Sequence, residues 1–312
     1  MTGATAITPQ RAGVWGAHGA GWRQAWQRGW ARLDARWFQL GFLASFLAIG
    51  ALAHDFALRP EQVVLAGVAA LLTQAAWLWG LQLPARYSAS GYLSACVSTL
   101  GLSILVRADN LWVHPVLAVL AMSSKFVLRA GPAGCRSHVL NPVNLAAFAA
   151  WAWLPGAWLS PGQWGHDSLL ALWMLALGGI VTRRVSRLDV SLAFLAAWGL
   201  LLAMRLWALG YAWHPGAAMW LQQIGNGAVL LFAFFMISDP MTTPQRAWVR
   251  MAFAVAVATA AFVWQFVLYR PHGLVVALFA ASWLVPLCNH LWPQRRFEWA
   301  AGSAQRPLLK PL

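Results

Sequence analysis

Long apolar runs separated by short basic connectors constrain this chain more than any other feature of its sequence. A membrane-spanning helix needs about 20 apolar residues. The composition agrees, because 60% of the residues are hydrophobic and only 10% are charged, whereas a soluble domain carries about 25% charged residues. The sequence predicts an all-α integral membrane protein of about ten transmembrane helices, near residues 37–53, 61–82, 90–106, 111–128, 139–154, 168–182, 188–209, 219–237, 246–265 and 272–291.

Most of the 22 Lys and Arg residues fall in connectors on one side of the predicted membrane. Lys and Arg are enriched in cytoplasmic connectors, so we expect both termini on the cytoplasmic side. This topology and attraction to anionic membrane lipids explain the formal net charge of +14. Nucleic acid is not an expected partner, because the basic residues form no single patch or nucleic-acid-binding motif.

Residues 1–36 form a basic segment ahead of the first predicted span. Its aromatic residues Trp22, Trp26 and Trp30 recur at helical spacing among arginines. The pattern predicts an amphipathic helix, which would lie on the inner leaflet or dock a partner protein.

The ten predicted spans fall into two halves related by a shift of about 130 residues, which superposes Asp109 on Asp239. Five helices per half place the halves in opposite orientations, as in inverted-topology repeats, whose binding sites lie between the repeats. We therefore predict a first repeat over 37–160, a second over 161–292, and a cytoplasmic tail over 293–312.

Asn141 and Asn144 stand at the cytoplasmic entrance of the fifth predicted helix, three residues apart and hence on one face. Polar residues within a bilayer are costly and mark functional sites. An N-cap role explains Asn141 but not Asn144, which lies one turn deeper. Two carboxamides there offer donors and acceptors to a polar heterocycle.

A second candidate region surrounds the end of the eighth predicted helix. Gly225 and Gly227 are expected inside that helix, where small residues permit close approach of a ligand or helix. Ser238 and Asp239 end it near the entrance of the fifth, although an Asp before a Pro also begins ordinary turns. The cysteine spacing and the histidines at helix ends predict neither a metal site nor haem, and we assign no catalytic residue.

These same stretches resemble a known family. Residues 124–126 (Ser-Lys-Phe), 138–142 (His-Val-Leu-Asn-Pro) and 234–240 (Phe-Phe-Met-Ile-Ser-Asp-Pro) are similar to the D subunit of the Rnf complex and equally to the B subunit of the Na⁺-translocating NADH:quinone oxidoreductase. The similarity covers roughly 40–292. It implies ten helices in two inverted repeats, the bacterial inner (cytoplasmic) membrane, other membrane electron-transfer subunits and quinone as partners, and electron transport coupled to ion transport.

The resemblance also implies a flavoprotein. Family members hold riboflavin non-covalently and carry FMN on a Thr of an S/T-x-A-T motif in the outer connector after the fifth helix. Asn141, Asn144 and Asp239 match the riboflavin neighbourhood. The connector 154–167 contains no Thr, and we interpret a Thr-Gly-Ala-Thr string at 2–5 as chance. We therefore expect a non-covalent flavin, riboflavin or FMN, and no covalent FMN.

Three functions remain open from the sequence. The leading hypothesis is a flavin-dependent electron-transfer subunit of an oxidoreductase complex, rather than an enzyme acting alone. The alternatives are a small-solute transporter or channel on the same inverted-repeat fold, and an assembly scaffold. A closed, aromatic-walled pocket would favour the flavin, and a continuous polar lining would favour transport.

Overall fold

The computed structural model of the chain describes residues 34–53, 58–82, 86–131, 137–160 and 168–297. The described residues from position 35 onward belong to one unit, Ala35–Glu298. The predicted amphipathic helix of segment 1–36 and most of the predicted tail lie outside the described residues.

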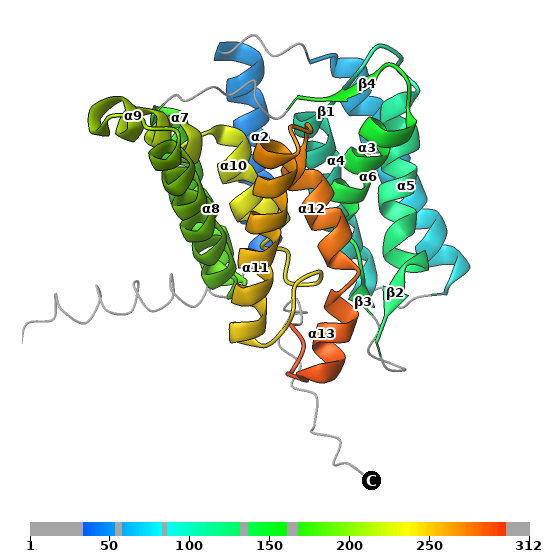
Figure 1. The fold of residues 1–312 in the computed structure, drawn as a ribbon. Coiled ribbons are helices and arrows are strands. Elements are labelled where there is room, and N and C mark those ends of the chain that lie inside the picture. The colour runs from blue at the N-terminus through cyan, green and yellow to red at the C-terminus, as the bar shows by residue number, and fades with distance from the viewer. Residues whose placement is uncertain (1–33, 54–57, 83–85, 132–136, 161–167, 298–312) are drawn as a thin grey trace, which may run out of the picture. The chain divides into compact units, whose positions relative to one another are not determined.

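Helices form because the apolar runs have few interruptions by Gly or Pro, and a helix satisfies its backbone hydrogen bonds internally. Figure 1 shows them as a bundle. The first half contains α2 (Ala35–Ala53), α3 (Pro60–Gly80), α4 (Arg86–Leu105), α5 (Val113–Val127) and α6 (Pro142–Trp153). The second half contains α7 (Ser168–Arg184), α8 (Leu188–Ala208), α9 (Trp213–Ile224), α10 (Gly227–Leu231) with the π-helix η1 (Phe232–Met236), α11 (Ala247–Phe262) with the π-helix η2 (Val263–Val267), α12 (Gly273–Ser282) and α13 (Val285–Leu291).

Each of the ten predicted ranges overlaps a helix, and the all-α membrane class is confirmed. Among the described residues, four helices are long and apolar enough to cross a membrane, or six if the two bent pairs each form one span. The number ten therefore stays a prediction. The helix α6 has 12 residues, which is only about 18 Å at 1.5 Å per residue.

Equivalent helices pack in the same way in the two halves. The helix α3 packs against α5 as α8 packs against α11, and α5 packs against α6 as α11 packs against α12. Similarly, α2 contacts α4 in the first half, and α7 contacts α10 in the second. This correspondence is what the predicted repeat requires.

The start of α3 and the start of α8 carry arginines in matching positions. Arg59 immediately precedes α3, and its Nη1 donates to the Asp109 carbonyl oxygen at 2.7 Å. Arg187 immediately precedes α8, and its Nη2 donates to the Pro240 carbonyl oxygen at 3.3 Å. Each arginine therefore binds the backbone that follows the third helical segment of its own half, which supports the pairing of Asp109 with Asp239.

Two short antiparallel ribbons mark opposite ends of the bundle (Figure 1). One pairs β1 (Val106–Ala108) with β4 (Ala157–Leu159). The other pairs β2 (Arg129–Ala130) with β3 (Ser137–His138). The helix α3 starts beside the first ribbon and α8 starts at the end that holds the second, so the two helices run in opposite directions, as an inverted repeat requires.

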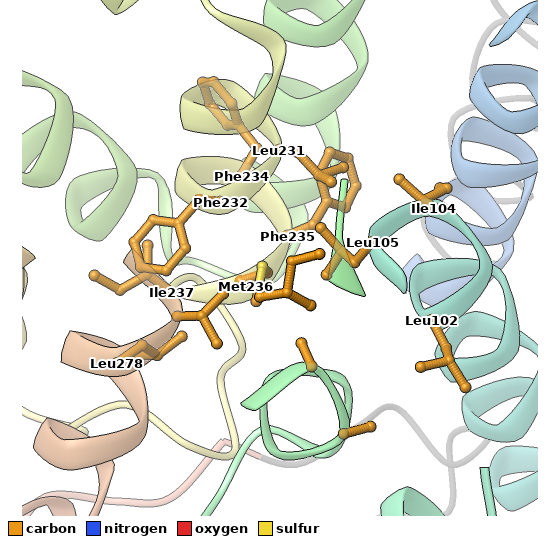
Figure 2. Packing of buried hydrophobic residues seen from close by; sticks show 14 of the residues in the cluster. Leu102, Ile104, Leu105, Leu231, Phe232, Phe234, Phe235, Met236, Ile237 and Leu278 are labelled. Carbon is orange, nitrogen blue, oxygen red and sulfur yellow. The ribbon is translucent and has the colours of Figure 1, made fainter. Parts of the chain in front are cut away.

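The segment η1 lies at the centre of the hydrophobic core. Figure 2 shows its side chains between Leu102 and Leu105 of α4 and Leu278 of α12. Phe235 stacks on Phe42 of α2 with ring centroids 4.5 Å apart. The second half therefore inserts η1 among helices of the first, and η1 ends directly before the Ser238–Asp239 motif.

The close approach of α7 to η1 depends on Gly178. A Cβ at Gly178 would lie 2.7 Å from Cγ of Phe234, whereas a Cβ at the neighbouring Gly179 would meet nothing within 4 Å. We expect Gly178→Ala to reduce the free energy of unfolding by about 1–3 kcal/mol through overpacking. Gly179→Ala should leave it unchanged or raise it by up to about 1 kcal/mol, because Ala is the better helix former.

Thermal unfolding of the two detergent-solubilised variants measures this difference. Equal melting temperatures for Gly178→Ala and Gly179→Ala would show that η1 does not pack on α7 as described.

Candidate functional site

Asn141 begins α6. Its backbone is extended, with φ −64° and ψ 123°, and its Oδ1 accepts hydrogen bonds from the backbone N–H groups of Val143 and Asn144 at 3.0 and 3.1 Å. Pro142 occupies the first helical position, where its missing N–H costs nothing. Local sequence alone therefore sets the start of this helix and the orientation of the Asn141 side chain.

Asp239 lies in the turn that follows η1. Its Oδ1 accepts from the Met241 N–H at 3.0 Å, and its backbone carbonyl accepts from the Thr243 hydroxyl at 3.0 Å. These bonds are those of a local Asp turn, so the carboxylate position is defined by its neighbours. Oδ2 is left facing the start of α6.

The two motifs predicted to be functional meet in space. The Asn141 Nδ2 donates to the Met236 carbonyl oxygen at 3.3 Å and to Asp239 Oδ2 at 3.4 Å. His138 Nε2 lies 3.8 Å from the same Oδ2. Because Asn141 belongs to the first half and Asp239 to the second, the site lies between the halves, where the repeat predicts it.

Asp239 is ionised at neutral pH. Burial raises the pKa of its carboxyl, but His138, the Met241 N–H and Lys125 together hold the pKa below its usual value. The Lys125 ammonium donates to Ser94 Oγ at 2.8 Å on α4. The site thus contains one half-buried carboxylate near two basic side chains, His138 and Lys125.

Asn144 lies one turn deeper than Asn141 and joins α6 to α12. Its Nδ2 donates to the Val275 carbonyl oxygen at 3.2 Å. Its Oδ1 is buried and has no hydrogen-bond partner among the described residues. A buried acceptor without a partner costs about 1–3 kcal/mol, so this atom is a candidate ligand contact.

The structure separates the remaining predicted residues from this centre. Ser238 is buried, and its hydroxyl donates to the Phe234 carbonyl oxygen at 2.6 Å, a bond within its own segment. Gly225 ends α9 and Gly227 begins α10. Gly227 precedes Asp239 by roughly 18 Å along the helix axis at 1.5 Å per residue, so the structure does not bring the glycines to Asp239.

The expectation that Gly225 and Gly227 lie inside one continuous helix is wrong. The two helices meet at an angle of 45°. Asn226 between them has an extended backbone, and its Oδ1 caps α10 by accepting from the Ala228 N–H at 2.8 Å. Asn is among the strongest N-cap residues, and this local bond interrupts the helix despite the continuous apolar pattern.

The sequence patterns did not single out Arg187. Its side chain is 3% exposed and holds the loop after Asp239. Nε donates to Thr243 Oγ1 at 3.0 Å, and Nη2 donates to Gln245 Oε1 at 2.8 Å. Burial lowers the pKa of Arg187 to about 10, which leaves it charged at neutral pH. Its equivalence to Arg59 was the signal that could have revealed it.

Comparison with protein-family models matches residues 109–298 to the NQR2, RnfD, RnfE family. This match covers more than half of the chain and includes both halves of the site. The chain belongs to this family. It is a membrane subunit of an Rnf/Nqr-type electron-transport complex, whose other subunits are its partners. No curated protein matches the chain in a direct comparison.

The connector that would carry the family's covalent FMN is described only up to residue 160. Its first part forms β4, in which Trp158 pairs with Arg107 of β1. The described part contains no Thr, and Thr5 lies outside the described residues. The expectation that no FMN is attached covalently stays a prediction.

Proposed function

We propose that this subunit relays electrons through a flavin bound non-covalently at the site formed by Asn141, Asn144 and Asp239. The observation that carries the proposal is the buried, unpartnered Oδ1 of Asn144. An isoalloxazine edge offers ring N–H and carbonyl groups, and this acceptor suits a ring N–H. A bound flavin supplies the electron-transfer chemistry, and the protein supplies binding, orientation and electrostatics.

The residues of the site divide these tasks. Asn144 accepts a hydrogen bond from the ligand, and its own Nδ2 is tied to Val275 so that the carboxamide cannot rotate freely. Asn141 holds the Asp239 carboxylate in place. The negative charge of Asp239 disfavours added negative charge nearby, whereas the positive charge of Lys125 offsets it. Cation coupling, reaction with quinone and location in a bacterial inner membrane rest on the family alone.

The first test is the visible spectrum of the detergent-purified protein before and after acid precipitation. We expect a flavin spectrum whose colour passes into the acid supernatant, because the cofactor is not covalently attached. Colour retained in the pellet would indicate covalent attachment instead. A colourless protein, purified together with its partner subunits, would contradict the proposal and favour the transporter.

Asn144→Ala should reduce the flavin content of the purified protein by about tenfold, because one buried hydrogen bond to the ligand is lost. Asp239→Ala should reduce it as well. Asn226→Ala is the matched control, since it removes an asparagine from a helix start distant from Asp239. Flavin per protein is measured by absorbance after acid extraction, and size-exclusion chromatography checks folding. Unchanged flavin in both Asn144→Ala and Asp239→Ala would refute the site.

A further inference from the structure

A small, partly open pocket lies at the end of the bundle that holds the β2–β3 ribbon. Its lining comes from the β2–β3 ribbon, from α13, and from Val139, Met241 and Arg296. The sequence patterns discussed above did not predict it. Both apolar and polar side chains line it. The polar residues that line it are Ser137, His138, Asn289 and Arg296.

Arg296 contributes the permanent charge of the pocket. Its Nη1 donates to Ser137 Oγ at a long distance of 3.4 Å, and no carboxylate of the described residues pairs with it. The adjacent Phe297 anchors this part of the chain, because its N–H donates to Gln245 Oε1 at 3.1 Å. The guanidinium is therefore folded back onto the protein, and none of the described residues supplies it with a counter-charge.

Gly131 makes room for this arginine. Its φ of +124° favours glycine, and a Cβ at this position would collide with Nη2 of Arg296. The neighbouring Arg295 is exposed and does not line the pocket. Arg295 and Arg296 thus have different environments, and only Arg296 lines the pocket.

Asn289 adds a second donor. Its Oδ1 accepts from the Gln245 backbone N–H at 2.9 Å, which orients its amide nitrogen as a donor for other groups. No hydrogen bond of that nitrogen to another described residue is present. The Ser137 hydroxyl provides a third donor. The pocket thus combines a guanidinium, an amide and a hydroxyl.

The geometry points to a binding site for a phosphate-type oxyanion, held by Arg296, Asn289 and Ser137. The fork of an Arg guanidinium matches phosphate oxygens in a bidentate arrangement, and a few convergent polar groups fix the orientation of a small ligand in its pocket. The phosphate can belong to a soluble phosphate ester or to the headgroup of an anionic lipid. Asn144 does not line the pocket, although His138 and Met241 contribute both to the pocket and to the surroundings of Asp239.

Binding of inorganic phosphate to the full chain in detergent, measured by calorimetry, tests the soluble source. Native mass spectrometry after exchange into vesicles of phosphatidic acid or of phosphatidylcholine tests the lipid source. We expect Arg296→Gln to weaken binding at least about tenfold, because a charge-assisted bidentate contact is lost. Gly131→Ala should weaken it through displacement of the guanidinium. Arg295→Gln, which removes the same charge from the neighbouring position, should bind like the unmodified chain.

The two experiments distinguish a soluble phosphate ester from a lipid headgroup. Phosphate binding that depends on Arg296 assigns a soluble ester, and selective retention of phosphatidic acid that depends on Arg296 assigns a lipid. Absence of both, or equal losses in Arg295→Gln and Arg296→Gln, would overturn the site. Neither result depends on flavin content, so this inference can fail while the proposed electron-transfer function stands.

Discussion

Arg187→Met should reduce the free energy of unfolding by about 3–5 kcal/mol, because it removes several buried hydrogen bonds of a charged group, each of which contributes about 1.5–3 kcal/mol. Arg187 is buried and donates hydrogen bonds to Thr243, Pro240 and Gln245. Methionine retains much of the apolar volume but makes none of these three hydrogen bonds. We also expect the loop after Asp239 to lose its fixed conformation, and hence the carboxylate to lose its position.

Arg183→Met is the control, because Arg183 lies nearby in the last turn of α7 but is exposed. Unfolding by SDS in mixed micelles measures both variants. Arg183→Met should lie within about 0.5 kcal/mol of the unmodified protein, as is usual for surface substitutions. Equal destabilisation by the two substitutions would mean that Arg187 acts only as a cytoplasmic charge and that its buried network is not formed.

Asn141→Ala should reduce the free energy of unfolding by about 2–4 kcal/mol, combining the loss of an N-cap with the loss of buried bonds to the other half. Asn141 is the residue whose side chain both caps α6 and reaches Met236 and Asp239. Its removal should therefore weaken the helix start and the contact between the halves together. The same mixed-micelle unfolding experiment measures it.

Two further variants separate these effects. Asn226→Ala removes a cap at the start of α10 and should cost about 1 kcal/mol. Asn141→Ser keeps a capping oxygen but shortens the side chain, so it should retain the cap and lose the bonds to the second half. If Asn141→Ser were as stable as the unmodified protein, the contact between Asn141 and Asp239 would contribute nothing.

The helix positions could be predicted because each apolar run must satisfy its backbone N–H and C=O groups with hydrogen bonds within the run when it lies in a membrane. The family could be predicted as well, because its motifs are short, local and retained at 138–142 and 234–240. The break at Asn226 could not be predicted. The hydrophobicity of a segment indicates that it lies in the membrane, but it does not indicate whether the helix there is continuous. A single side-chain cap decided it.

The candidate site could likewise be predicted only in part. The sequence by itself determined that Asn141 starts a helix and that Asp239 sits in a turn before Pro240, because both features come from bonds to residues within four positions. Only the tertiary structure decided that these residues touch, that Arg187 is buried beneath their loop, and that Asn144 keeps an unpartnered acceptor. Such contacts join residues far apart in the chain, and they form only when the two halves pack together around η1.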